Sequence, residues 1–305
     1  MSGPFLRFED GKISLGGKDL AVQSANLSIA PTLEPERVYG DYDASIAGAK
    51  TEFINFAPTQ NLKGQLDISF YISAETFAQD GSPNSIDRMF EIKNGMSEQP
   101  INQNVVGRYR FDNMYLTSFS FSLSPLQVIQ ASATYDIYGS INRTIDRRFH
   151  KDTVDFAHAM KSFGRMEASG TDIDVATQRQ FEISSLKYNI IVGRKIYNTI
   201  RAAEHTSTNT NANGVVPARV SVENIEAEMN IESNEMIPLL NAYGDRQALT
   251  SPESIADSEV EAFLYDLQGN KIARFPVVGK IQSQSSSISE GDYAKSSITI
   301  KQIIK

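Results

Sequence analysis

The chain of 305 residues contains no cysteine and no tryptophan, and its only histidines are His150, His158 and His205. Without cysteine there can be no disulfide framework, thiolate zinc site, iron–sulfur cluster or cysteine nucleophile. The histidines are also too far apart for the i, i+4 pair of a helical zinc site. We therefore expect no catalytic residue, no cofactor and no metal, and we expect that the protein is not an enzyme.

Long apolar runs and an excess of positive charge are missing too. No stretch of ~18 apolar residues occurs, so we expect no membrane span. Arg7, Glu9 and Asp10 fall where a signal peptide needs its apolar core, and on that ground we expect no secretory export. The formal net charge of −8 argues against binding to nucleic acid, because phosphate binding needs clustered Lys and Arg.

The sequence contains partial matches to known chemical motifs, but none of them is complete. Gly16-Gly17-Lys18 lacks the Gly-x4-Gly-Lys-Ser/Thr spacing of a phosphate-binding loop. The acidic residues between Glu34 and Asp43, and between Glu223 and Glu228, lack the spacing of a calcium loop, so a solvated face explains them better. No serine lies in a Gly-x-Ser-x-Gly elbow.

Alternation of apolar and polar residues dominates what is present. This pattern is typical of half-buried antiparallel strands. Turn residues in 268–270 and 290–292 predict two hairpins near the end of the chain. The alternating apolar sets are Leu66, Ile68, Phe70 and Ile72; Phe119, Phe121 and Leu123; Ala131, Ala133, Tyr135 and Ile137; and Ile225, Ala227, Met229 and Ile231.

The chain also resembles itself. Residues 118–134 align with 283–299 at a shift of 165, which superposes serine on serine repeatedly, as at Ser120 and Ser285. Earlier segments align in the same order: 25–29 with 186–190, 37–39 with 195–197, and the set from Leu66 to Ile72 with Ile225 to Ile231. The sequence thus predicts two copies of one β-rich domain.

This repeat predicts four segments: an N-terminal arm (residues 1–20), a first β domain (21–141), a connector (142–180) and a second β domain (181–305). In the connector, Asp152 as a cap, an apolar stripe and a stop at Gly164 predict a short helix. The stripe consists of Phe156, Met160 and Phe163. Further helices are expected after Phe77 and Met236 and over residues 86–94. The connector is either packed against the domains or docked on a neighbouring subunit.

Residues 281–289 are unusual because both faces of this expected strand are small and polar over most of its length. Such a strand cannot bury either face in a core. It is either an exposed hairpin arm or a strand that pairs with another chain or lines an aqueous channel. The candidate residues for a subunit contact or channel wall are Ser283, Ser285 and Ser287, with their repeat counterparts Ser118, Ser120 and Ser122.

Several of these segments resemble a known family. Residues 24–29, 37–39 and 64–71 are similar to the opening of a domain found in the tail-tube and tube-like structural proteins of tailed phages and related injection systems. Residues 118–125 and 131–139 resemble the closing hairpin of such a domain. The resemblance covers about 120 residues of the first copy, and in the second copy it rests on the internal alignment.

The resemblance implies two tandem antiparallel β-sandwich or barrel domains of tail-tube type, each with a short flanking helix. It implies a structural virion protein, assembled in the host cytoplasm, that forms a ring as a tube, tube initiator or baseplate hub. Such a ring encloses a channel through which DNA passes without sequence-specific binding. Its partners would be copies of itself, as a trimer or a hexamer, and other tail or baseplate proteins.

Two rival functions fit the same pattern. One is a virion component without a tube, in the neck, on the capsid or in host binding, built from tandem β-sandwiches. The other is an enzyme or a carbohydrate-binding module on a β-sandwich, which usually displays clustered aromatic residues beside carboxylates. The lack of tryptophan counts against this second rival.

Overall fold

The structure is a computed structural model in which strands and turns account for the described residues, with no α-helix among them. The described residues are 13–20, 22–30, 33–38, 53–58, 63–72, 98–139, 141–143, 158–168, 179–197, 219–234, 257–265, 271–290 and 294–304.

All pairings between these strands are antiparallel. In the first half of the chain the strands are β1 (Ile13–Leu15), β2 (Lys18–Asp19), β3 (Val22–Ala30), β4 (Leu33–Val38), β5 (Phe53–Pro58), β6 (Lys63–Tyr71), β7 (Asn104–Val106), β8 (Tyr109–Phe111), β9 (Met114–Leu123), β10 (Gln130–Tyr138) and β11 (Ile141–Arg143). In the second half they are β12 (His158–Ala168), β13 (Arg179–Tyr197), β14 (Arg219–Ser233), β15 (Asp257–Tyr265), β16 (Lys271–Ser287) and β17 (Lys295–Ile304).

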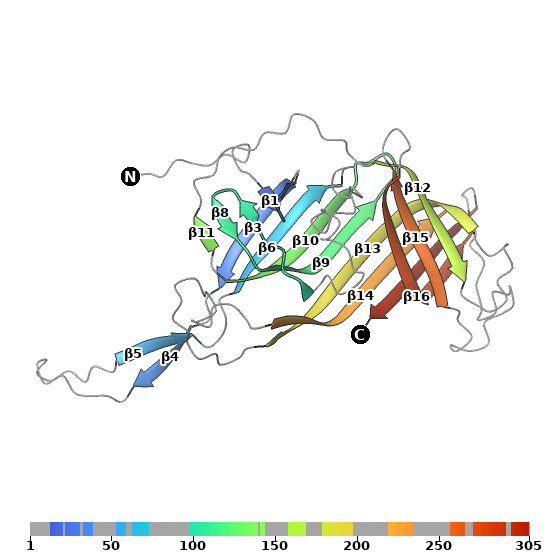
Figure 1. The fold of residues 1–305 in the computed structure, drawn as a ribbon. Helices are drawn as coiled ribbons and strands as arrows, with labels where there is room; N and C mark the ends of the chain where they lie inside the picture. Colours follow the sequence, from blue (N-terminus) through green and yellow to red (C-terminus); the bar gives the residue numbers. More distant parts are fainter. Residues whose placement is uncertain are drawn as a thin grey trace, which may run out of the picture.

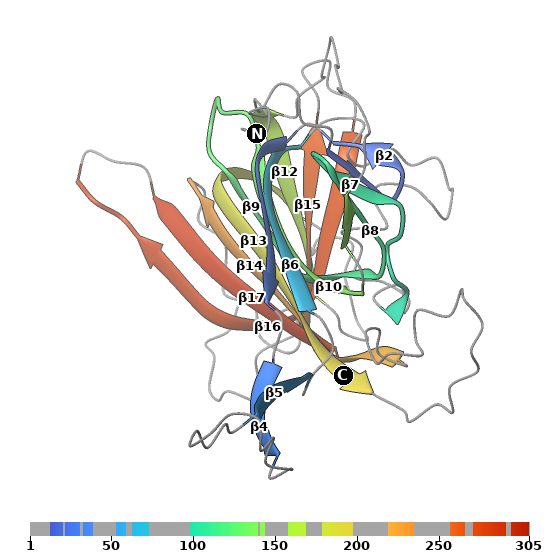
Figure 2. The same ribbon diagram turned by 90° about the vertical axis from the view of Figure 1, so that its left-hand side faces the viewer.

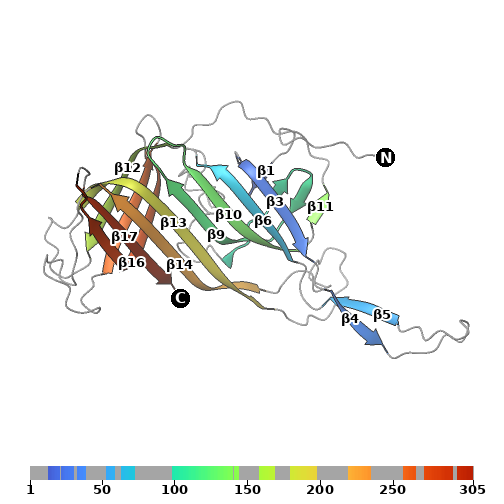
Figure 3. The same ribbon diagram turned by 180° about the vertical axis from the view of Figure 1, so that it is seen from behind.

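One large sheet joins the two halves of the chain. Its strand order is β12-β15-β16-β17-β14-β13-β9-β10-β6-β3. The strands from β3 to β17 lie side by side in Figure 3, and the halves meet where β9 pairs with β13. The same ladder of backbone hydrogen bonds therefore continues from one half into the other.

The second half of the sheet closes on itself. The first residues of β13 pair with β12, so the order β12-β13-β14-β17-β16-β15 returns to β12 as an antiparallel barrel. Strand β13 is long enough to close this barrel at residues 179–182 and to pair with β9 at residues 186–191. A single strand thus belongs to both halves.

The first half of the sheet is covered by a smaller one. This sheet has the order β11-β8-β7-β1-β2 and lies over β3, β6 and β10 in Figure 1. Gly16 and Gly17 both have positive φ angles, 57° and 78°, and form the tight turn between β1 and β2. The glycines that failed to match a phosphate loop therefore shape a hairpin.

Two hairpins extend away from the body of the molecule. Among the described strands, β4 and β5 pair only with each other, and they project from one end (Figures 1 and 3). The ends of β16 and β17 that are joined by residues 288–294 project in another direction (Figure 2). Both predicted hairpins near the end of the chain are confirmed by the β15–β16 and β16–β17 pairings.

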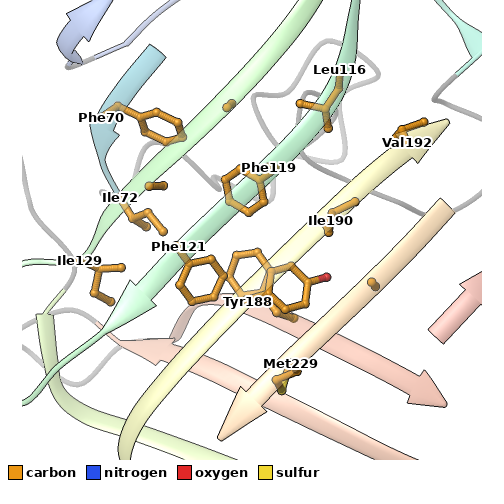
Figure 4. Packing of buried hydrophobic residues seen from close by; sticks show 14 of the residues in the cluster. Phe70, Ile72, Leu116, Phe119, Phe121, Ile129, Tyr188, Ile190, Val192 and Met229 are labelled. Atoms are coloured by element: carbon orange, nitrogen blue, oxygen red, sulfur yellow. The ribbon is translucent and has the colours of Figure 1, made fainter. Parts of the chain in front are cut away.

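The main hydrophobic core lies on one face of the large sheet, and Tyr115, Tyr138 and Val220 form a small separate cluster. Leu66, Ile68 and Phe70 contribute to the main core as the alternation predicts. Aromatic rings from three strands meet at its centre: the ring centroids of Phe121 and Phe275 are 4.6 Å apart, and those of Phe121 and Tyr188 are 5.3 Å apart. Figure 4 shows Phe119, Phe121 and Tyr188 on the same side of their strands. The core is therefore continuous across the junction of the two halves.

The prediction of a mainly β, antiparallel fold is confirmed, whereas the connector helix is wrong where the structure describes it. Residues 158–168 form β12, which pairs with β13 and β15. A helix as short as the predicted one is marginal in water, and pairing with two strands outweighs its local signals. The helices expected after Phe77, after Met236 and over residues 86–94 lie outside the described residues.

Candidate functional site

The face of the large sheet opposite the core is polar across eight neighbouring strands, and we call it the polar face. Successive side chains of a strand point to opposite faces, so each buried set implies an exposed set between its members. The residues below are exposed or half-buried. They are Ser24, Asn26 and Ser28; Gln65, Asp67 and Ser69; Gln130, Ser132, Thr134 and Asp136; Ser118, Ser120 and Ser122; Lys187 and Asn189; Glu226, Glu228, Asn230 and Glu232; Ser297, Thr299 and Lys301; and Lys280, Ser283, Ser285 and Ser287.

All six candidate serines lie on the polar face, in two separate groups. Ser118, Ser120 and Ser122 are on β9, which is flanked by β10 and β13 inside the sheet. Ser283, Ser285 and Ser287 are on β16, beyond β17. At ~4.8 Å per strand the groups are about 19 Å apart, so one chain does not bring them together.

The strand order of the first half repeats in the second half. Strands β3-β6-β10-β9 are neighbours in the first half, and β13-β14-β17-β16 are neighbours in the second. The strands that cover the core correspond as well: β1 pairs with β7 in the first half, and β12 pairs with β15 in the second. Each half therefore contains an equivalent set of sheet neighbours in the same chain order.

Bulges occur at equivalent positions in the two halves. On β9 the register shifts between Ser118 and Leu116, and on β16 it shifts between Ser283 and Ile281, in each case 165 residues further on. Ser120 faces Ser132, with 2.8 Å between their Oγ atoms, and Ser285 faces Ser297 in the corresponding place. The shift of 165 found in the sequence thus superposes both pairing and bulge.

A second bulge pair relates β3 to β13. The register shifts between Val22 and Ser24 and again between Ile183 and Ser185, which are 161 residues further on. Val22 pairs with Phe70 on β6, and Ile183 pairs with Ser233 on β14. When Val22 is aligned with Ile183, Phe70 is therefore aligned with Ser233, a shift of 163. The sequence alignment of the set from Leu66 onwards, at a shift of 159, is therefore wrong by four residues.

Charge on the polar face is nearly balanced. Its carboxylates are Asp67, Asp136, Glu226, Glu228 and Glu232, and its ammonium groups, counting Lys63 and Lys295 at the strand ends, are Lys63, Lys187, Lys280, Lys295 and Lys301. Five of each sign cancel among these residues, and Arg194, over the Tyr115 ring beside Asp136, adds one positive charge, whereas the whole chain carries −8. The face is consequently mostly polar and close to neutral, with exposed Ile191, Val278 and Ile303 among its hydroxyl, amide and charged groups.

Several of these charges are held in specific pairs. Lys63 Nζ lies 2.9 Å from Asp136 Oδ2, and Lys301 Nζ lies 2.9 Å from Glu226 Oε2. A hydrogen bond with Glu226 and attraction to that carboxylate raise the pKa of Lys301. Ion pairs that water still reaches, such as these, contribute little stability, so their main effect is to cancel charge locally.

Sequence reasoning missed a cluster around Arg194 at the junction of the two halves. Arg194 Nε donates a hydrogen bond to the Leu116 carbonyl oxygen at 2.8 Å, and its guanidinium carbon lies 5.2 Å from the centre of the Tyr115 ring. Burial lowers the pKa of Arg194 to about 10, which leaves it charged at neutral pH. The side chain fastens β13 to β9 beyond their last ladder pair, Ile191 with Ser118. No motif marks it, because it acts across strands that are far apart in the sequence.

Comparison with known protein families and with curated proteins gives no match. Among the described residues, no group of three His, Asp or Glu side chains is arranged to hold a metal ion. No helix in that part of the chain has the length and apolar character to cross a membrane. Of the three histidines, His158 begins β12, and His150 and His205 lie outside the described residues.

Proposed function

We propose that the protein is a structural ring protein of a phage-type tail: a tube, tube initiator or baseplate hub. The observation that carries the proposal is the junction between β9 and β13, where one copy of a repeated sheet continues into the next. A chain that already joins two such copies edge to edge has the contact that a closed ring repeats. We take residues 21–141 and 181–305 as the two copies.

The arrangement favours three chains in the ring over six. Both copies contribute their sheets to one continuous wall, so each occupies an equivalent place and three chains supply six places. Three chains provide 24 strands, which at ~4.8 Å spacing and ~40° tilt form a wall about 48 Å across between backbones. That width accommodates a DNA duplex.

The polar face is the side that we assign to the channel. The core face is occupied by the small sheet and by β12 and β15, which leaves the polar face as the inner surface. A wall with little net charge neither holds nor repels a phosphate backbone strongly, which suits DNA in transit. In this proposal the protein works in the virion, is assembled in the host cytoplasm, and meets other tail or baseplate proteins at the ring's two rims.

Light scattering and negative-stain images of the purified chain test the proposal. Three chains of 33.7 kDa predict a particle of about 101 kDa with a central hole. A monomer at all concentrations, or a compact oligomer without a hole, would contradict it and favour a virion component without a tube.

A matched pair of variants tests whether the trimer depends on the edge of the sheet. Ser285→Glu with Ser287→Glu places charge on the terminal strand of the sheet, where charged side chains discourage strand addition, and should reduce the trimer at least severalfold. Ser120→Glu with Ser122→Glu changes the equivalent serines inside the chain, where β9 and β13 are already joined, and should leave the trimer largely intact. Circular dichroism checks that both variants remain folded.

A further inference from the structure

The eight-strand part of the sheet ends in two strands that are paired on one side only by the strands described. Among the described strands, β3 pairs with β6, and β16 beyond Lys280 pairs with β17. Their backbone groups on the other side form templates for strand addition. An exposed isoleucine accompanies each edge: Ile29 is 47% exposed and Ile288 is 70% exposed.

The internal junction supplies the geometry that these edges need. Strand β9 pairs with β13 over six residues, from Leu123 opposite Leu186 to Ser118 opposite Ile191. The bulges make β16 the counterpart of β9 at a shift of 165 and β3 the counterpart of β13 at a shift of 161. The two terminal strands are therefore copies of the two strands that already pair with each other.

We propose that the distal part of β16 pairs antiparallel with β3 of a second copy of this chain, in the register of the internal junction. This inference rests on the proposed ring function and specifies its contact. Ser120 opposite Asn189 becomes Ser285 opposite Ser28, and Ser122 opposite Lys187 becomes Ser287 opposite Asn26. The same register puts Ile288 opposite Ala25, so both lose exposure to water.

The contact between chains is more polar than the one within the chain. On the core face, Phe121 and Tyr188 of the internal junction are replaced by Ser286 and Leu27. The intermolecular contact then depends mainly on backbone hydrogen bonds, and none of the residues opposed in it, 25–30 and 283–288, is charged. We therefore expect it to be reversible on dilution and insensitive to salt.

Cysteine cross-linking tests the register, since the natural chain has no cysteine to interfere. The double variant Ser28→Cys with Ser285→Cys is oxidised mildly, or treated with a short bis-thiol reagent, and separated on a denaturing gel. Directly opposed residues of an antiparallel pair lie ~5 Å apart between Cα atoms, within reach of a disulfide. We expect a ladder that ends at three linked chains.

A control pair uses the same strands in a different register. Ser24→Cys with Ser285→Cys keeps one partner and moves the other by four residues, about 13 Å along β3, which is beyond the reach of a disulfide. This variant should stay at least tenfold less cross-linked under the same conditions. Ser24 and Ser285 are both exposed, so accessibility does not account for a difference.

The outcomes separate this inference from the proposed function. If the images show rings but the Ser24→Cys and Ser28→Cys double variants cross-link equally, or neither cross-links, the register is overturned and the ring stays in place. A ladder that continues past three chains would overturn the closed trimer. A chain without rings and without cross-links at any concentration would overturn both proposals.

Discussion

Buried tyrosines give the protein a dependence on alkaline pH. Tyr135 and Tyr188 are almost fully buried, and burial raises the pKa of each hydroxyl well above the ordinary value of 10. Tyr138 is shifted in the same direction by burial and by the adjacent Asp136. A raised folded-state pKa contributes stability that is present below the unfolded value and is lost as pH rises beyond it.

We therefore expect the midpoint of thermal unfolding to fall once the pH exceeds about 10, the unfolded value. Tyrosinate absorbance measures the same effect, and the lack of tryptophan keeps that signal clean. The buried hydroxyls should ionise only when the chain unfolds, after the exposed ones. Tyr135→Phe should weaken the alkaline loss and cost little at neutral pH, because the Tyr135 hydroxyl has no hydrogen-bond partner among the described residues. A smooth titration of every tyrosine in the folded chain would contradict the prediction.

At the residue scale, the sequence predicted which face of the sheet a polar side chain occupies better than it predicted the residues that lie across from it. Alternation placed Ser118, Ser120 and Ser122 opposite the buried set of Phe119, Phe121 and Leu123, and the structure agrees. The role of Arg194 was not predictable, because its partners Tyr115 and Leu116 are distant in the chain. Local periodicity tells which face a residue occupies and not what lies across from it.

Two glycines show how tightly the strands approach one another. A Cβ atom added to Gly279 would overlap the Lys301 carbonyl oxygen, which is fixed in the β17 backbone. A Cβ atom added to Gly193 would meet the side-chain oxygen of Asn224, which can rotate away. Gly279 therefore faces a rigid neighbour, the Lys301 backbone, whereas Gly193 faces a side chain that can move.

Gly279→Ala should lower the free energy of unfolding by about 1–3 kcal/mol, the usual cost of overpacking. Gly193→Ala should cost clearly less, because only a side chain has to move. Denaturation with urea compares the two variants with the natural chain. Equal losses would mean that the β16–β17 backbone adjusts as readily as the Asn224 side chain.

The errors at the scale of elements have definite physical origins. The shifts of 159 and 163 for the set from Leu66 onwards differ by four residues, and changing a shift by any even number keeps alternating residues on the same face. Only the bulges at Gln23 and Ser184 fix the register, and a bulge has no signature in the alternation. The connector helix failed for a related reason, since pairing with β13 and β15 is invisible in the local sequence.

At the scale of the whole molecule, the shared strand and the common core predict one unfolding transition. Phe119 and Phe121 of the first half pack against Tyr188 and Phe275 of the second. Neither half can separate without exposing these rings. We expect Phe121→Ala to destabilise the chain by about 3–5 kcal/mol while leaving a single transition.

Urea denaturation followed by circular dichroism and by tyrosine fluorescence checks this prediction. Leu126→Ala is the control, because Leu126 is 76% exposed and its truncation should change stability by less than about 0.5 kcal/mol. Two transitions in the natural chain, or a Phe121→Ala effect confined to one of two transitions, would show that the halves unfold independently.

In the proposed ring, the covalent link between the two copies also changes the kinetics of assembly. Strands β9 and β13 meet within one molecule, so their contact forms at the effective concentration set by the intervening chain and does not depend on how many molecules are present. In a ring with six junctions, three are then complete as soon as each chain has folded. Closing the ring requires three molecules to meet, where six unlinked domains would require six. A protein made in few copies per cell gains most from this difference, because the rate of a higher-order encounter falls steeply with dilution.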